Sequence, residues 1–234
     1  GALGTSQDAT FDTIVNLSKD TEIPITPHLT CVDTNKKQVT ELIDKYISHG
    51  VNQVMVLKGD TPSKPLHKGD FEYANEMVKF IKEHYDNIDI LVAAYPEKHP
   101  HSMNIRTDID FFVDKVNSGA TQAITQYFYN IDAYFHYIDE LQKRNIDIPI
   151  TPGIMPITNY EQLINFSKTC GAEIPAWILN RLKLYRHDPE SLKEFGQDVV
   201  SEMCLNLKEN GVNSFHFYSM NKAEPVLSIS KILI

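Results

Sequence analysis

The most compact group of chemically capable residues in the sequence is the turn Lys58-Gly59-Asp60, which follows an apolar segment. A glycine lets the backbone approach a ligand closely, a lysine can meet a phosphate or an electron-rich ring, and an aspartate adds a negative charge beside them. The same triplet also forms ordinary surface turns. The triplet alone therefore leaves both a ligand-binding turn and an exposed surface pair open.

A second candidate is His28, near the end of another apolar segment. A lone histidine in such a place is more often structural than functional, but the strand ends of a parallel sheet are also where a barrel assembles its site. Three residues further on, we interpret Cys31 as a small buried hydrophobic residue rather than a nucleophile.

The densest candidate site spans residues 93–101, with the sequence AAYPEKHPH. Its small alanines leave room beside a sheet, its prolines stiffen the loop, and Tyr95 and His99 are presented together. A metal ion bound by Glu97, His99 and His101 is conceivable, but their spacing matches no recognised ligand pattern. An organic cofactor fits this segment better than a metal.

Two pairs of residues have helical spacing. Asp108 and Lys115 are seven apart and would share a helix face, from which they could reach a polyhydroxyl chain and a phosphate. A solvated helix face explains the same spacing. Gln162 and Phe166 are four apart and could line a planar ligand, or pack in the core.

Gln126 ends another apolar segment and is followed by aromatic residues. A glutamine amide can pair with the donor and acceptor edge of a heterocycle, and aromatic rings can stack on it. For the aromatic residues, the alternative is simply a place in the core.

Six short apolar segments rich in Val, Ile, Ala and Tyr predict the buried strands that must position these residues. They span residues 23–30, 51–57, 88–95, 120–128, 146–154 and 212–218. Helical patterns lie between them, at residues 39–47, 71–85, 108–118, 131–144, 158–169 and 189–210. We expect Thr34 or Asp33 to cap the first of these helices and Gly50 to follow it, and Asp188 and Pro189 to open the last.

Strict alternation of strands and helices predicts a parallel sheet covered by helices, either an open doubly wound sheet or a closed (β/α)8 barrel. Chemically capable residues at the end of almost every strand favour the barrel, and the absence of a glycine-rich phosphate loop weakens the open sheet. We therefore predict an α/β protein with a (β/α)8 TIM barrel, forming a single domain over residues 1–234. Six strands are visible, and residues 1–4 look like the turn after a strand, so we expect the first one or two strands to lie upstream of Gly1.

The composition fits an ordinary globular protein of 234 residues, of which 42% are hydrophobic. A net charge of −9 argues against nucleic acid as a partner. The three cysteines lack metal-ligand spacing and suit a reducing compartment. No apolar run approaches the ~20 residues of a membrane span, and no signal-like segment opens the sequence, so we expect a cytoplasmic protein without a membrane partner.

Taken together, these segments resemble the methylenetetrahydrofolate reductases, flavoenzymes that reduce methylenetetrahydrofolate to methyltetrahydrofolate. The resemblance runs in order across essentially the whole chain. Its motifs are PHLTC at 27–31, LKGD at 57–60, AAYPE at 93–97, HP at 99–100, AITQ at 123–126, PGIMP at 152–156, IPAW at 174–177, FHFY at 215–218 and NKAE at 221–224.

The resemblance implies FAD at the carboxyl ends of the barrel strands, reduced by NADH or NADPH. The implied FAD contacts are His28, Lys58, Gly59, Asp60, Tyr73, Ala74, Tyr95, His99, Ser102, Asp108 and Lys115. The implied contacts to folate and the nicotinamide are Gln126, Gln162, Phe166 and Lys222. Asp60 also takes the catalytic place of the aspartate whose charge favours the iminium form of the folate. We expect a homo-oligomer, of a size that the sequence does not specify.

Three departures from the family pattern qualify this expectation. The family's first strand ends in Phe-Glu-Phe-Phe-Pro-Pro, whose glutamate is the general acid, and we expect that stretch upstream of Gly1. Lys58 and Lys222 stand where many relatives carry arginine, and the sequence has no room for the regulatory domain of eukaryotic relatives, which favours the bacterial type. The alternatives are a flavin-free pterin-binding barrel of a folate-dependent methyltransferase and a catalytically incomplete binding subunit.

Overall fold

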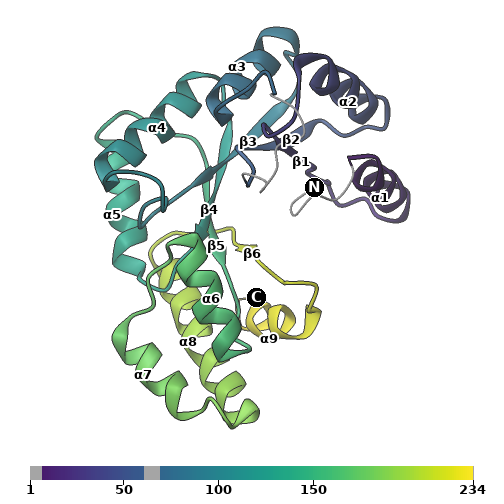
Figure 1. The fold of residues 1–234 in the computed structure, drawn as a ribbon. Coiled ribbons are helices and arrows are strands. Elements are labelled where there is room, and N and C mark those ends of the chain that lie inside the picture. The colour runs from purple at the N-terminus through teal and green to yellow at the C-terminus, as the bar shows by residue number, and fades with distance from the viewer. Residues whose placement is uncertain (1–6, 61–68, 234) are drawn as a thin grey trace. The chain divides into compact units, whose positions relative to one another are not determined.

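The computed structural model describes residues 7–60 and 69–233, along which strands and helices alternate except between β5 and β6, where three helices follow one another (Figure 1). The chain divides into two compact units. One holds the part of the chain before Ala94 together with Phe112–Ala123, and the other holds Ala94–Phe111 and the part after Ala123. Three elements contribute residues to both units: β3 (Asp89–Ala94), whose last residue belongs to the second unit, α4 (Ile105–Asn117) and β4 (Gln122–Tyr127).

The first unit is built on three parallel strands. Its elements in chain order are α1 (Gln7–Asp20), β1 (His28–Thr30), α2 (Lys36–Ser48), β2 (Gln53–Leu57), α3 (Ala74–His84) and β3 (Asp89–Ala94). In the register, His28 lies opposite Met55 and Val54 lies opposite Ile90. Thr121, just before β4, donates its backbone N–H to the carbonyl of Ile90 at 2.9 Å. Each strand therefore neighbours the next one along the chain.

Helix α2 shows how the sequence forms these elements. Val39, Ile43 and Tyr46 recur at helical spacing, and all three are buried. The cap is Asn35, whose side chain accepts a hydrogen bond from Gln38 N–H while the Gln38 side chain accepts one from Asn35 N–H. The expectation that Thr34 or Asp33 caps this helix was wrong, because the capping box places the helix start after Asn35.

The second unit contains the end of β4 and two further parallel strands. Its elements are α5 (Ile131–Gln142), β5 (Ile150–Ile154), α6 (Tyr160–Cys170), α7 (Ala176–Leu184), α8 (Pro189–Glu209), β6 (His216–Phe217) and α9 (Ala223–Leu233). Gly153 N–H donates to Thr125 Oγ1 at 2.8 Å, and Gly153 lies opposite His216 in the register. A Cβ on Gly153 would lie 2.2 Å from the Thr125 carbonyl oxygen, so only glycine allows β4 and β5 to approach this closely.

The longest helix, α8, begins as predicted. Asp188 accepts a hydrogen bond from Ser191 N–H, and Pro189 occupies the first turn. Gly196, in its middle, faces Ile157, and a Cβ there would lie 2.5 Å from the Ile157 carbonyl oxygen. Glycine at this position therefore lets α8 pack directly against the chain that follows β5.

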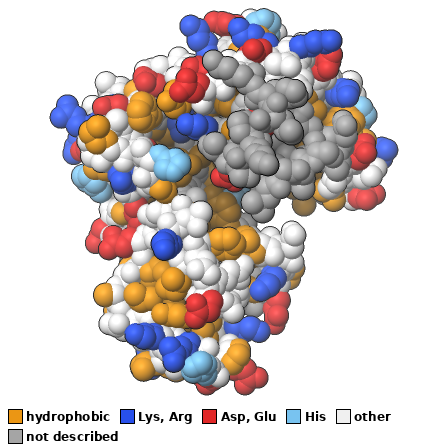
Figure 2. Space-filling model, viewed as in Figure 1, with side chains coloured by type: hydrophobic (Ala, Val, Ile, Leu, Met, Phe, Trp, Pro, Cys, Tyr) orange, Lys and Arg blue, Asp and Glu red, His pale blue; other side chains and the backbone are white. Residues whose placement is uncertain are grey.

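The predicted parallel α/β architecture is confirmed, with six strands in the order of the chain among the described residues. The described helices include none that is long and apolar enough to cross a membrane. Acidic and basic side chains are interspersed over the face shown in Figure 2, where the described basic residues form no continuous stripe. The predicted turn at residues 1–4 lies outside the described residues.

Candidate functional site

The turn after β2 is held against the chain that follows β1. Val32 N–H donates to the Lys58 carbonyl at 3.2 Å, which extends the strand pairing beyond β1 and β2. Gly59 has φ +84°, and a Cβ there would lie 3.0 Å from the Thr30 Cβ. Glycine is thus required both by the backbone conformation and by the close approach of Thr30. Lys58 and Asp60, on either side of Gly59, are exposed.

Tyr73 and Ala74 lie at the start of α3, and Tyr73 is half exposed. The Lys58 ammonium lies 4.6 Å from the centroid of the Tyr73 ring, within cation–π range. Glu76 accepts a hydrogen bond from the backbone N–H of Tyr73 at 3.4 Å and so helps to fix the start of the helix. The structure therefore brings the predicted residues Lys58 and Tyr73 into direct contact.

Two further predicted residues of the first unit are His28 and Lys115. His28 was expected near the end of a strand, but it opens β1 and is solvent-exposed. The ammonium of Lys115, on α4, donates a hydrogen bond to the carbonyl of Ala93 at the end of β3.

Cys31 is buried, and its burial raises the pKa of the thiol to about 12. A thiol with this pKa stays protonated at neutral pH, as expected for a small buried hydrophobic residue rather than a nucleophile.

The loop between β3 and α4 is organised by Asp108, which is only 7% exposed. Its carboxylate accepts a 2.5 Å hydrogen bond from the Ser102 hydroxyl and a 3.1 Å bond from His99 N–H. The rings of Tyr95 and His99 meet edge to face, with centroids 4.7 Å apart. Four predicted site residues of the second unit thus form one connected group, and Asp108 uses both of its oxygens inside the loop.

Glu97 lies in the same loop and was not predicted as a cofactor or substrate contact. Its Oε2 accepts a 2.8 Å hydrogen bond from the backbone N–H of Glu173, and its Oε1 is buried without a partner among the described residues. Burial raises the pKa of this carboxyl to about 7. Sequence spacing carried no signal for this contact, because the two residues are far apart in the chain.

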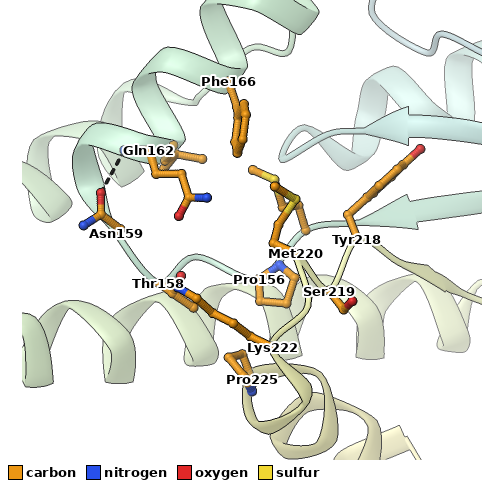
Figure 3. A pocket seen from close by; sticks show the side chains of 12 residues that line it. Pro156, Thr158, Asn159, Gln162, Phe166, Tyr218, Ser219, Met220, Lys222 and Pro225 are labelled. Carbon is orange, nitrogen blue, oxygen red and sulfur yellow. Dashed lines mark hydrogen bonds between the residues drawn. The ribbon is translucent and has the colours of Figure 1, made fainter. Parts of the chain in front are cut away.

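A hollow of about 360 Å³, which includes space open to solvent, lies between α6 and the chain that follows β6 (Figure 3). Gln162 and Phe166 project from α6 on one side, and Lys222 lies on the opposite side. The remaining lining residues are Met155, Pro156, Thr158, Asn159, Leu163, Tyr218, Ser219, Met220 and Pro225.

Local backbone structure explains how two sides of this hollow are built. Asn159 caps α6 by accepting a hydrogen bond from Gln162 N–H at 2.8 Å. Met220 and Asn221 both adopt left-handed conformations, with φ of 50° and 58°, and Lys222 N–H donates to the Ser219 carbonyl at 2.9 Å. The resulting tight turn presents Lys222 at the rim.

The structure does not place every predicted substrate contact at this hollow. Gln126, on β4, is absent from its lining, and the Gln126 side-chain oxygen accepts a hydrogen bond from the backbone N–H of Tyr127 at 3.0 Å. Met155 and Met220 line the hollow but were not singled out from the sequence. Their apolar side chains carried no signal that distinguishes a ligand site from the core.

Comparison with known proteins reveals consistent similarities over the whole chain. The family model described as methylenetetrahydrofolate reductase matches residues 1–233. The 5,10-methylenetetrahydrofolate reductase of Buchnera aphidicola subsp. Schizaphis graminum is 38% identical, over 98% of this chain and 77% of that protein. The protein of the same name from Escherichia coli is 34% identical, over 100% of this chain and 78% of that protein.

Among solved structures, the chain is similar to an uncharacterised protein from Clostridium thermocellum, described as binding two copies of 5-methyl-5,6,7,8-tetrahydrofolic acid. The TM-score is 0.62 at 18% identity, over 93% of this chain and 74% of that one. Oxaloacetate acetylhydrolase follows with a TM-score of 0.51 at 12% identity, over 88% of this chain and 79% of that one. At these identities the likeness concerns the fold, and it agrees with the predicted barrel class.

Proposed function

The chain belongs to the methylenetetrahydrofolate reductase family, and we propose that it reduces methylenetetrahydrofolate to methyltetrahydrofolate with FAD and a reduced nicotinamide. The observation that carries the proposal is the hollow beside α6. Gln162 and Phe166 from α6 and Lys222 from the NKAE motif line it together. An amide, an aromatic ring and a cation are the groups that an anionic ligand with a planar heterocycle requires.

Within this hollow, each side chain has a distinct part in binding. The Gln162 amide pairs with the donor and acceptor edge of the heterocycle, and the Phe166 ring packs against its face. The Lys222 ammonium meets a carboxylate of the folate or a phosphate of the nicotinamide. Both planar ligands thus use the same side chains in turn, and Gln126, from β4, is the fourth proposed contact.

For the cofactor, the side chains present fit a flavin nucleotide. Lys58 and Lys115 provide cations for phosphate, and Gly59 permits close approach of the backbone. His28, Tyr73 and Ala74 complete this group in the first unit. In the second unit, Tyr95, His99, Ser102 and Asp108 form the connected loop that contacts the cofactor.

When bound, FAD supplies the transfer of hydride from the nicotinamide to the folate. Asp60 contributes charge rather than a covalent bond, because a carboxylate near the folate favours its cationic iminium form over the closed ring. Asp60 is exposed at the end of the turn after β2, and Gly59 fixes the backbone next to it.

The proposal extends to the setting of the reaction. We expect a homo-oligomer in the cytoplasm, acting in one-carbon and methionine metabolism with NADH or NADPH as donor. The free cysteines support a reducing compartment.

One spectrum of the purified protein tests the cofactor. A yellow protein with the absorbance bands of oxidised flavin, bleached when a reduced nicotinamide is added without oxygen, is the expected result. A colourless protein that binds methyltetrahydrofolate would instead support the flavin-free pterin-binding barrel. A yellow protein that binds folate but does not turn it over would support the catalytically incomplete binding subunit.

A further inference from the structure

Glu97 joins two segments that are far apart in the sequence. Its Oε2 accepts a 2.8 Å hydrogen bond from the backbone N–H of Glu173, in the segment between α6 and α7. The same segment approaches the β3–α4 loop a second time at Gly171, where a Cβ would lie 2.9 Å from the Pro100 Cγ. The two backbones are therefore packed closely, and Glu97 is the side chain that links them by a hydrogen bond.

Each of the linked segments carries side chains assigned above to a ligand. The β3–α4 loop carries Tyr95 and His99, whose rings are in contact. Helix α6, which ends at Cys170 just before the linked segment, carries Gln162 and Phe166. Glu97 itself is absent from the lining of the hollow, so its effect on a ligand would have to pass through these elements.

The surroundings of Glu97 favour its neutral form. Its Oε1 is buried without a partner among the described residues, and burial raises the pKa of the carboxyl to about 7. The charged or titratable groups that face it are Glu173, whose negative charge acts in the same direction, and Tyr127 on β4. Lys98, its neighbour in the loop, donates its ammonium hydrogen bond to the Ser102 carbonyl at 2.9 Å.

We propose that Glu97 is a positioning residue that fastens α6 to the β3–α4 loop and so sets the geometry between the substrate-binding and flavin-binding side chains. This inference depends on the proposed function for the identity of the ligands. The hydrogen bond from Glu173 N–H favours the ionised carboxylate, but burial and the charge of Glu173 outweigh it, so the packed arrangement is more stable with a neutral carboxyl. The folded state thus keeps a proton on Glu97 that the unfolded chain loses above the ordinary glutamate pKa, and the packed arrangement loses stability as the pH rises through about 7.

The test uses the flavin-loaded protein and four variants. Glu97→Gln keeps an acceptor for Glu173 N–H and cannot ionise, whereas Glu97→Ala removes the acceptor. Glu173→Gln removes the neighbouring charge and leaves the backbone N–H in place. Glu161→Gln, at an exposed position in the first turn of α6, is the matched control. The measurements are the KM for methylenetetrahydrofolate as a function of pH and the hydrogen-exchange rate of the Glu173 amide.

In the parent protein, KM should rise several-fold as the pH passes through about 7. Glu97→Gln should hold KM near the low-pH value throughout, Glu97→Ala should raise KM at every pH, and Glu173→Gln should move the midpoint to lower pH. The Glu173 amide should exchange about ten-fold faster in Glu97→Ala and at the parent rate in Glu161→Gln.

Two results would overturn the inference: an unchanged Glu173 exchange rate and KM in Glu97→Ala, or a parent-like pH dependence in Glu97→Gln. Failure of the proposed function looks different. In that case the protein would not reduce the folate at all, but the exchange rate of the Glu173 amide would still depend on Glu97 and on pH.

Discussion

The ammonium group of Lys58 lies 4.6 Å from the centre of the Tyr73 ring, which connects the turn after β2 to the first residues of α3. Both side chains are exposed, so a cation–π contact here is worth only ~0.5–1 kcal/mol. Its main effect is to restrict where the Lys58 charge can lie. In the proposed function, this charge and the half-exposed tyrosine face the same cofactor.

Replacing Lys58 tests whether that charge binds the flavin. Lys58→Met keeps most of the aliphatic stem and removes the charge, so the flavin dissociation constant should rise about ten-fold or more, as expected for loss of a charge-assisted contact. Flavin fluorescence on dilution measures the release. The control is Lys37→Met on α2, where an exposed lysine pairs with Glu41 at 3.6 Å, and this variant should retain flavin as the parent does. Equal retention by the Lys58 variant would remove Lys58 from the cofactor site.

A second prediction concerns the stability of the β3–α4 loop. Asp108→Asn replaces a buried acceptor of two hydrogen bonds by an amide whose NH₂ group faces one of the donors. The free energy of unfolding should fall by about 1.5–3 kcal/mol. Urea denaturation measures this change, with the exposed Asp114→Asn on the same helix as the control. An unchanged midpoint would mean that Ser102 and His99 do not depend on this carboxylate.

The hollow beside α6 gives a third prediction. Gln162→Leu keeps the size of the side chain and removes its hydrogen-bonding amide, leaving the polar edge of a bound heterocycle unpaired. The KM for methylenetetrahydrofolate should rise about ten-fold or more, with the flavin spectrum unchanged. Asn165→Ala, at an exposed position on the same helix, should keep the parent KM. A parent-like KM in the Gln162 variant would show that the folate binds elsewhere.

Measuring the two half-reactions separately distinguishes charge stabilisation of the folate by Asp60 from mere positioning of the flavin. Asp60→Asn keeps the shape of the side chain and removes its charge, so reduction of the folate should slow by about ten-fold or more. Reduction of the flavin by the nicotinamide should change much less, because that step forms no folate cation. Equal losses in both half-reactions would mean that Asp60 only positions the flavin.

Much of the fold followed from local patterns in the sequence, but the ends of the strands did not. Residues 23–30 were predicted as one strand, whereas β1 contains only His28–Thr30. Pro24 and Pro27 lack the backbone N–H that a strand ladder needs, which explains the shorter element. Helix α7 was not predicted because apolar residues lie on its exposed side as well as its buried side. Trp177 and Leu184 are exposed, so the sequence shows no single apolar face.

The candidate site was predicted best where one short segment carries it. The spacing of Gln162 and Phe166 was sufficient to place them on one helix face, and both line the same hollow. The link from Glu97 to the Glu173 backbone was not predictable, because it joins residues 76 positions apart and involves a main-chain donor that any residue offers. Contacts of this kind depend on tertiary packing rather than on residue type or spacing.

Flavin-mediated hydride transfer to the folate is tested most directly by following flavin absorbance through both half-reactions in an anaerobic stopped-flow experiment. NADH or NADPH should bleach the oxidised flavin, and methylenetetrahydrofolate should then restore its absorbance while one methyltetrahydrofolate forms per flavin. A protein without flavin, or a reduced flavin that methylenetetrahydrofolate does not reoxidise, would contradict the proposed function.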